Sequence, residues 1–516
     1  PRGLLAGVTL PGGGSAAYAW DALGCLSRLT DLNASSWTFA YTPMGRLQTL
    51  TDPLGRATQF GYDARGTLAT IAWPGAGGTL ACTRDPNGAV VRADFSGGPD
   101  LAFQYDANGQ LTNAAGLSLA YDAEGRVIRA AREAVYGATY DAAGRLATVA
   151  CHDGALTVAY TYATGAGNDG RLTRVRDSLT GTQVDFTYDA DRRLRTIAFP
   201  NGETITYTWD GADRLIRIQS GGHVDITLAH DRSGRIASTA MTAPLTPPAQ
   251  VAAASAALQF DAASQVSSAG FAHDARGRVT GIPATFHPEL LQLTWDGASR
   301  LTAVNGVALA YDAFGDLVRR TEGGTAIRYD RHPALARHPI VVEKNETSGT
   351  LLRYYVWTPG GRLLYLIDAA AGNQVRFFHY DRTGSTLALT DATAAVTDAY
   401  VYDPFGRLLA RTGATPQPFT FGGAWGVRQE GASGLLYQMR ARYYHAALAR
   451  FLSPEPLWPL LASPKALNPY QYAGADPVRF GDPEGLLPED TIASLEQELA
   501  IIDATIQNLW ANMDRW

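Results

Sequence analysis

The sequence predicts an all-β fold built from many copies of one short unit. The clearest copies contain an aromatic residue, Asp, two variable residues, Gly, often Arg, and then Leu or Val. They begin at Tyr62, Tyr105, Tyr121, Tyr140, Tyr311 and Tyr402. Looser copies place Trp, His or Phe before the Asp, at Trp20, Trp209, His230, Phe260, His273 and Trp295. Asp189, Asp210 and Asp231 follow one another at 21 residues, a length that suits two short strands and two turns.

The Asp-x-x-Gly step of each unit has the chemistry of a turn. The Asp carboxylate can accept hydrogen bonds from backbone N–H groups two residues on, and Gly tolerates a positive φ. The aromatic residue and the Leu are then expected to face the same side, while the Arg stays in water. Between turns the residues alternate as in a half-buried strand, for example over 202–209. A single unit cannot bury its apolar face, so the units are expected to stack into one extended body.

Composition excludes several classes of function. The 516 residues carry a net charge of −6 with both signs interspersed, so the repeats offer no basic surface for nucleic acid. No apolar run approaches the 18 residues of a membrane span. Cys25, Cys82 and Cys151 are odd in number and widely spaced, which favours buried free thiols over a disulfide framework. The nine His are scattered, so we expect neither a metal site nor a cofactor.

From Gly434 onward the sequence departs from the repeat. It contains, in order, Arg442-Tyr443-Tyr444, Ser453-Pro454-Glu455-Pro456, Asn468-Pro469-Tyr470 and Asp482-Pro483-Glu484-Gly485-Leu486. With the upstream repeats, this block closely resembles the core of the Rhs (YD-repeat) family. Bacterial polymorphic toxins and the C subunits of insecticidal toxin complexes share that core. The resemblance covers essentially the whole chain, and residues 442–486 are its most specific part.

The resemblance implies a fold and a function. Family members wind a β-strip into a hollow cocoon that encloses a toxic C-terminal domain in an unfolded or partly folded state. The conserved end of the core curls inward as a plug, and an intramolecular aspartic protease cuts the chain there. By this likeness we expect a YD-repeat shell over 1–433, a plug over 434–486 and the start of a variable effector region over 487–516. The chain begins at Pro1, and we expect it to be a fragment or a processed product.

The resemblance also assigns site residues. Asp482 matches the Asp of the family's Asp-Pro-x-Gly-Leu motif, and the bond between Leu486 and Leu487 would be cut. Arg450 matches the Arg ahead of the first acidic element, where the family usually has Asp and this chain has Glu455. Asp476 is an alternative second acid, at a position where the family usually has Asn.

Two carboxyl groups suit this reaction because amide hydrolysis needs an activated water and a proton for the leaving nitrogen. The extra methylene of Glu455 displaces its carboxyl, and misplacement by about 1 Å can slow a reaction by about 10²-fold. A simpler interpretation is that Asp482 only shapes one more turn.

Downstream of Leu487 the pattern changes to that of a helix. Ile492, Leu495, Leu499, Ile502, Ile506 and Leu509 repeat at intervals of three and four residues, as in a short amphipathic α-helix. This segment could be a truncated toxin start, a retained anchor, or a binding helix for a chaperone or immunity protein.

The sequence therefore predicts a secreted bacterial toxin shell, delivered to a target cell by contact or by type VI secretion. At most it is a single-turnover intramolecular aspartic peptidase. Its expected partners are its own toxin cargo, a component of the secretion system, a chaperone or an immunity protein. Two alternatives stay open. One is a cleavage-inactive YD-repeat surface protein that binds a ligand such as carbohydrate, and the other is a toxin-complex C subunit whose shell is closed by a B-type partner.

Overall fold

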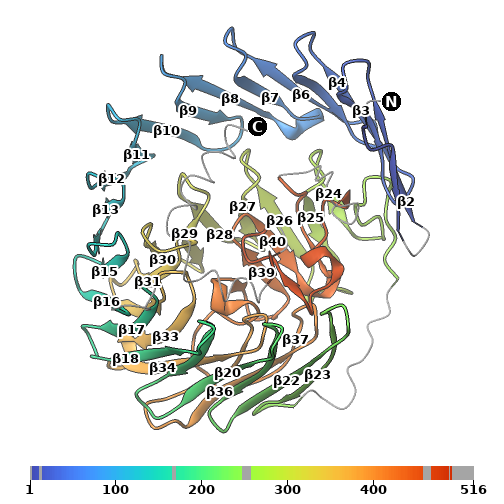
Figure 1. Cartoon of the computed structure of the whole chain (residues 1–516). Helices are drawn as coiled ribbons and strands as arrows, with labels where there is room; N and C mark the ends of the chain where they lie inside the picture. Colours follow the sequence, from blue (N-terminus) through green and yellow to red (C-terminus); the bar gives the residue numbers. More distant parts are fainter. Residues whose placement is uncertain are drawn as a thin grey trace. The chain divides into compact units, whose positions relative to one another are not determined.

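The computed structural model describes residues 3–10, 14–164, 170–246, 257–456, 467–486 and 489–490. Their secondary structure is almost entirely antiparallel strand and turn, which confirms the predicted all-β class (Figure 1). The predicted helix over 492–509 and residue Leu487 lie outside these ranges. The described 3-10 turns are η1 Gly75–Gly77, η2 Ala369–Ala371, η3 Gly423–Trp425, η4 Ala446–Leu448 and η6 Ala473–Ala475.

Two compact units make up the chain, and each gathers segments that are distant in sequence. The first unit contains Pro1–Ala115, Ala253–Ala308 and Arg442–Ala475. Its strands are β1 Gly7–Thr9, β2 Ser15–Trp20, β3 Leu26–Thr30, β4 Ser36–Tyr41, β5 Leu47–Thr51, β6 Ala57–Tyr62, β7 Leu68–Ala72, β8 Thr79–Arg84, β9 Val90–Phe95, β10 Asp100–Tyr105, β11 Leu111–Ala114, β24 Ala272–His273, β25 Val279–Ile282, β26 Leu291–Trp295, β27 Leu301–Val304, β40 Arg442–His445 and β41 Arg450–Phe451.

The second unit contains Gly116–Ala252, Leu309–Ala441 and Asp476–Trp516. Its strands are β12 Leu117–Tyr121, β13 Val127–Ala131, β14 Val135–Tyr140, β15 Leu146–Cys151, β16 Leu156–Tyr162, β17 Leu172–Asp177, β18 Gln183–Tyr188, β19 Leu194–Ala198, β20 Thr204–Trp209, β21 Leu215–Ser220, β22 Val224–His230, β23 Ile236–Thr242, β29 Leu317–Glu322, β30 Thr325–Arg331, β31 Ile340–Asn345, β32 Leu351–Trp357, β33 Leu363–Asp368, β34 Gln374–Tyr380, β35 Thr386–Thr390, β36 Val396–Tyr402, β37 Leu408–Thr412, β38 Arg428–Glu430, β39 Leu436–Met439, β42 Phe480–Gly481 and β43 Glu489–Asp490. Strand β28 (Val307–Tyr311) spans both ranges. The predicted boundaries at 433 and 486 stay a prediction.

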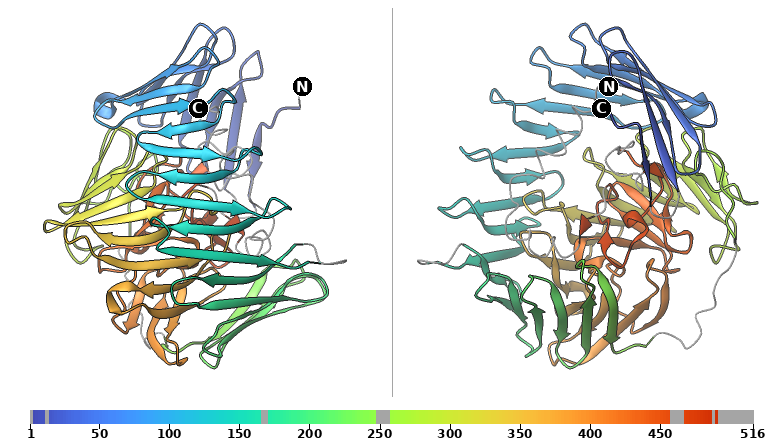
Figure 2. Two further views of the ribbon diagram at one scale, coloured as in Figure 1. Left: turned by 90° about the vertical axis from the view of Figure 1, so that its left-hand side faces the viewer. Right: turned by 45° about the vertical axis from the view of Figure 1, so that its right-hand side comes forward.

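Successive strands pair with their neighbours in sequence, as the repeat predicts. In the second unit β14 pairs antiparallel with β15 and β15 with β16, and this order continues to β23 (Figure 2). The register shifts by one residue at the aromatic position of a repeat, for example between Thr139 and Tyr140. Such a bulge increases the local twist of the strands.

The core of the second unit lies between two layers of strands. Phe199 packs against Phe377 with ring centroids 5.0 Å apart. The Tyr365 hydroxyl donates to Asp177 Oδ2 at 2.9 Å, and Arg362 donates to the Tyr207 hydroxyl at 2.7 Å. Burial of aromatic rings and hydrogen bonds between polar side chains thus hold strands β17–β20 against strands β33–β34.

The Asp of each repeat makes the predicted turn contacts. Asp63 Oδ1 accepts the backbone N–H of Arg65 and of Thr67, both at 2.9 Å. Gly66 has φ +80° and donates its N–H to the Asp63 carbonyl at 2.9 Å. The same pair of carboxylate contacts recurs at Asp21, Asp106, Asp210 and Asp403. This part of the sequence analysis is confirmed.

The prediction that the repeat Arg stays in water is wrong for several copies. Arg126 Nε donates to Asp122 Oδ2 at 2.7 Å, and its guanidinium lies 4.5 Å from the ring centroid of Tyr140 in the next repeat. The Arg126 side chain is only 22% exposed. The flat guanidinium can pair with a carboxylate and stack on a ring at once, which explains the difference.

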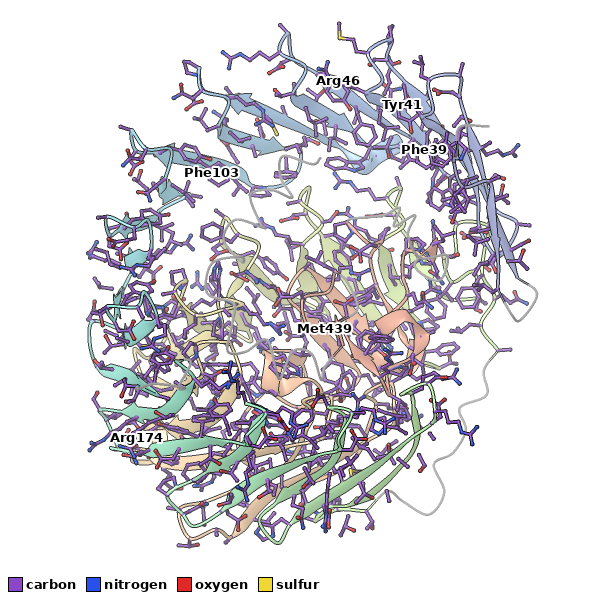
Figure 3. All side chains as sticks on the ribbon, in the orientation of Figure 1. Phe39, Tyr41, Arg46, Phe103, Arg174 and Met439 are labelled. Atoms are coloured by element: carbon purple, nitrogen blue, oxygen red, sulfur yellow. The ribbon has the colours of Figure 1, made fainter. Side chains whose placement is uncertain are left out.

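The aromatic residue of one repeat also bonds to the preceding repeat. The Tyr62 hydroxyl donates to the Leu47 carbonyl at 2.7 Å. Equivalent bonds of 2.8–2.9 Å join Tyr41 to Leu26, Tyr105 to Val90, Tyr140 to Val127, Tyr162 to Leu146, Tyr188 to Leu172 and the Trp209 indole to Leu194. Each repeat is therefore fixed to its neighbour by a polar bond as well as by apolar packing. Tyr41 and the buried Phe39 of the same strand are labelled in Figure 3.

We expect Tyr62→Phe to lower the free energy of unfolding by about 1 kcal/mol, because it removes one hydrogen bond and leaves the Leu47 carbonyl without its donor. Tyr18→Phe is the matched control. Tyr18 lies in the same unit and its ring is buried, whereas Tyr62 is half-buried, and among the described residues the Tyr18 hydroxyl has no hydrogen-bond partner. Denaturant unfolding of both variants measures the difference, and equal losses would contradict the role of this bond.

Candidate functional site

The residues that sequence reasoning assigned to the site are divided between the two units. Arg450 and Glu455 belong to the first unit, whereas Asp476, Asp482 and Leu486 belong to the second. The two sets are therefore described separately.

In the first unit, Glu455 is paired with an arginine that sequence reasoning did not single out. Glu455 is only 9% exposed, and Arg442 from β40 places a guanidinium nitrogen 2.7 Å from its Oε2. The Glu455 N–H donates to the Pro469 carbonyl at 2.7 Å, and Arg442 donates to the same carbonyl at 3.2 Å. The Arg442 guanidinium also lies 3.5 Å from the ring centroid of Phe451. These contacts fix the Glu455 carboxylate in one position beside a positive charge.

Arg450 has a different environment. Its guanidinium donates to the Ser264 carbonyl and lies between two rings, 4.8 Å from the centroid of Phe260 and 4.7 Å from that of Tyr470. Burial lowers the pKa of Arg450 to about 10. These contacts suit a residue that joins segments of the first unit, and the arginine ion-paired with Glu455 is Arg442.

In the second unit, Asp482 follows β42 and forms a turn like those of the repeats. Its Oδ1 accepts the N–H of Leu486 at 2.9 Å, and its carbonyl accepts the N–H of Gly485 at 3.2 Å. Gly485 has φ +66°. Unlike the partly exposed Asp63 of a repeat, Asp482 is buried, with 1% exposure. Asp476 is exposed, so Asp482 is the better candidate for a reactive carboxyl in this unit.

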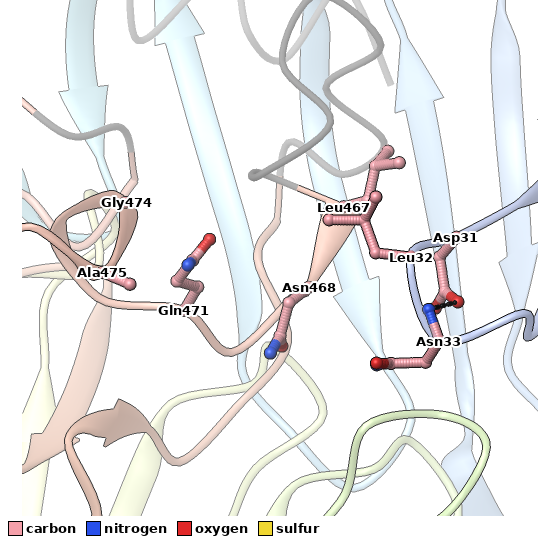
Figure 4. Close-up of a pocket in the computed structure, with 8 residues that line it drawn as sticks. All are labelled: Asp31, Leu32, Asn33, Leu467, Asn468, Gln471, Gly474 and Ala475. Atoms are coloured by element: carbon pink, nitrogen blue, oxygen red, sulfur yellow. Dashed lines mark hydrogen bonds between the residues drawn. The ribbon is translucent and has the colours of Figure 1, made fainter. Parts of the chain in front are cut away.

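A pocket of about 300 Å³ in the first unit contains none of these residues (Figure 4). It is lined by Asp31, Leu32, Asn33, Leu467, Asn468, Gln471, Gly474 and Ala475. The Asp31 carboxylate accepts the N–H groups of Asn33 and Ser35, both at 2.9 Å. It therefore serves the local turn, and the pocket suggests no catalytic group.

We next consider the other His, Cys, Asp and Glu side chains of the described residues. Within the described ranges no three His, Cys, Asp or Glu side chains gather as metal ligands would, and no helix there has the length and hydropathy to cross a membrane. Cys25, Cys82 and Cys151 are free thiols, but only Cys151 is buried, and the other two are half-buried. Burial raises the pKa of Cys151 to about 12, which leaves it unreactive near neutral pH.

His445 and His287 form a buried pair in the first unit with ring centroids 5.7 Å apart. His445 is fully buried, and neither of its ring nitrogens has a hydrogen-bond partner among the described residues. Burial, assisted by the neighbouring His287, lowers the pKa of His445 to about 3. The folded protein therefore keeps this ring neutral.

We expect His445 to make the protein acid-sensitive. In the unfolded chain a His takes up its proton near pH 6.5, whereas folded His445 resists it down to about pH 3. The unfolded state thus binds more protons in this window, and stability falls as pH falls from about 6.5 towards about 3. His445→Leu should flatten that dependence, whereas His223→Gln at a half-buried site should not. Unfolding free energies at pH 7 and pH 5 test this, and equal slopes for His445→Leu and the parent would contradict it.

Comparison with known proteins agrees with the repeat and its geometry. The Teneurin YD-shell family model matches residues 258–478, and the RHS Repeat model matches residues 41–72. Over these residues the two matches support an Rhs/YD-repeat assignment. The curated relatives that it matches are much longer proteins. The tRNA nuclease WapA of Bacillus subtilis is 24% identical over 199 residues, which are 37% of this chain and 8% of WapA. The toxin protein Tse5 of Pseudomonas aeruginosa is 31% identical over 121 residues, which are 23% of this chain and 9% of Tse5.

Solved structures match most of the length of this chain. The crystal structure of TcdB2-TccC3-TEV matches with a TM-score of 0.52 and 14% sequence identity, over 92% of this chain and 34% of that one. At this identity the match concerns the fold, and it agrees with the all-β class and the long antiparallel sheets. The chain spans only about a third of that structure and less than a tenth of WapA and of Tse5.

Proposed function

We propose that this toxin-related YD-shell protein encloses a C-terminal toxin segment and frees it by cutting its own chain between Leu486 and Leu487. The observation that carries the proposal is the Asp482 turn. Its carboxylate is buried, and it contacts the backbone N–H of Leu486, the residue before the expected cut.

Two carboxyl groups would perform the reaction. One acts as base and takes a proton from a water, which attacks the Leu486 carbonyl carbon. The other acts as acid and protonates the nitrogen of Leu487 as the C–N bond breaks. The products are a carboxylate on Leu486 and an amine on Leu487. The family resemblance assigns these two roles to Asp482 and Glu455, and we keep that assignment as part of the proposal.

The shell role rests on the repeats and on the relatives. Stacked two-strand units make a long strip with one apolar face, which suits a wall around a cargo. WapA and Tse5 are named as a nuclease and a toxin, so we propose that a toxic segment follows residue 486 here as well. Secretion, type VI delivery and a chaperone or immunity partner belong to the same proposal.

A second candidate is a toxin-complex C subunit whose shell is closed by a B-type partner. The match to the TcdB2–TccC3 structure over 92% of this chain favours it. Co-expression with a B-type protein and size-exclusion chromatography distinguish the two, because a self-sufficient shell elutes alone.

The intact mass of the full-length protein under denaturing conditions tests the proposed function. A break between Leu486 and Leu487 is expected, and the downstream piece should stay protected from added protease until the shell is unfolded. A break between Asp482 and Pro483 would indicate acid lability of that bond. An unbroken chain would refute self-cleavage and favour a cleavage-inactive YD-repeat binding protein.

A further inference from the structure

One repeat of the second unit has a carboxylate where other repeats have an arginine. In Tyr311-Asp312-Ala313-Phe314-Gly315-Asp316-Leu317, Asp316 stands at the position of Arg126 and Arg145 in their own repeats. Each of those arginines donates to the Asp of its own turn, at 2.7 and 2.8 Å. Asp316 cannot do so. It is 1% exposed and follows a second carboxylate, Asp312, in the same turn.

Arg440 supplies the charge that this repeat lacks. Its Nε donates to Asp316 Oδ1 at 3.0 Å, and Arg331 lies 3.8 Å from the same oxygen. His338 Nδ1 lies 3.4 Å from Asp316 Oδ2. Burial opposes ionisation of Asp316, but the positive charges of Arg440 and Arg331 outweigh it and hold the pKa of Asp316 below its usual range. A buried carboxylate with these partners is ionised at neutral pH.

The same guanidinium of Arg440 also binds the turn that precedes the expected cleavage site. Arg440 Nη1 donates to Glu484 Oε2 at 2.8 Å, and the next residue, Ala441, donates its N–H to the Glu484 carbonyl at 3.0 Å. Arg337 lies 3.4 Å from Glu484 Oε1. Glu484 stands midway between Asp482 and Leu486. Both its side chain and its backbone are therefore held by the segment that carries Arg440.

We propose that Asp316, Arg440 and Glu484 form a latch that positions the Asp482–Leu486 turn for self-cleavage, an inference that rests on the proposed function. All three are positioning residues, since the reacting groups belong to other residues. Arg440 can serve both carboxylates because its guanidinium has several donors in a rigid plane. Loss of one partner leaves a buried charge that is no longer compensated, so the turn is released rather than slightly loosened.

Two substitutions in the full-length protein separate the latch from the fold. Glu484→Gln keeps the size of the side chain and removes its charge. Asp316→Arg introduces the usual residue of the repeat, so Arg440 faces a like charge in place of its carboxylate partner. Glu124→Gln is the matched control. Glu124 occupies the same place in the Asp122-Ala123-Glu124-Gly125 turn, pairs with Arg126 at 2.9 Å, and has a side chain that is 65% exposed.

We expect scission at Leu486 to slow by at least about 10-fold in Glu484→Gln and about 100-fold in Asp316→Arg. Glu124→Gln should stay within about twofold, and both Glu124→Gln and Glu484→Gln should keep the thermal midpoint of the parent. Hydrogen exchange at the Gly485 and Leu486 amides should become faster in Glu484→Gln and Asp316→Arg but not in Glu124→Gln. A general loss of stability would instead raise exchange throughout the unit and not only in this turn.

The outcomes for the latch and for the proposed function differ. If the parent is cut and Glu484→Gln and Asp316→Arg are cut equally fast, the latch is overturned and self-cleavage stands. If the parent is not cut, self-cleavage fails and exchange at Gly485 and Leu486 decides the latch. Raised exchange in both variants then supports it, and exchange equal to that of the parent overturns it.

Discussion

Asp482→Asn is expected to leave the chain whole, with a scission rate at least about 10³-fold below that of the parent. Asn has nearly the shape of Asp and keeps an oxygen that can accept the Leu486 N–H, so the turn should persist. What Asn lacks is a group that can gain and lose a proton at neutral pH. One of the two proton transfers in amide hydrolysis, to or from Asp482, is then lost. Intact mass followed over time after purification measures the rate.

Two further variants define what this loss means. Asp476→Asn tests the alternative second acid: an unaltered rate would leave Glu455 as the partner of Asp482, and a lost cut would assign that role to Asp476. Glu455→Asp supplies the residue that the family usually has, and a faster cut would show that the extra methylene slows this chain. Scission between Leu486 and Leu487 at the parent rate in Asp482→Asn would exclude Asp482 as the catalytic acid or base.

Arg442→Met is expected to destabilise the first unit by about 3–5 kcal/mol, because it leaves the Glu455 carboxylate buried without its guanidinium. The Pro469 carbonyl loses a donor in the same variant. The double variant Arg442→Met, Glu455→Leu removes both charges and should recover most of that stability, since two apolar side chains can replace a buried ion pair. Scission would stay lost in the double variant, because a proposed catalytic carboxyl is gone.

Denaturant unfolding of the single and double variants gives the coupling free energy between Arg442 and Glu455. Arg92→Met is the control within the same unit. Arg92 and Asp100 also approach to 2.6 Å, but their side chains are 53% and 51% exposed, so little change is expected. Losses that simply add in the double variant would contradict a functional ion pair at Glu455.

The sequence by itself determined the features that depend on residues close together in the chain. The fold class follows from the repeat, and the turns follow from Asp and Gly within five residues of each other, as Asp63 and its contacts confirm. The family followed from motifs whose order and spacing are visible in the sequence. The position of the expected cut came from the same local motif and stays a prediction.

Only the tertiary structure decided which charges meet. Arg442 was not expected to pair with Glu455. Arg440 was not expected to contact both Asp316, 124 residues away in sequence, and Glu484, 44 residues away. The Arg126 side chain, expected in water, packs on a ring of the next repeat. Contacts within a turn are fixed by short-range geometry, whereas a pair between distant charges depends on the path of all the intervening strands. Burial then determines how much such a pair contributes, and no local pattern in the sequence records that burial.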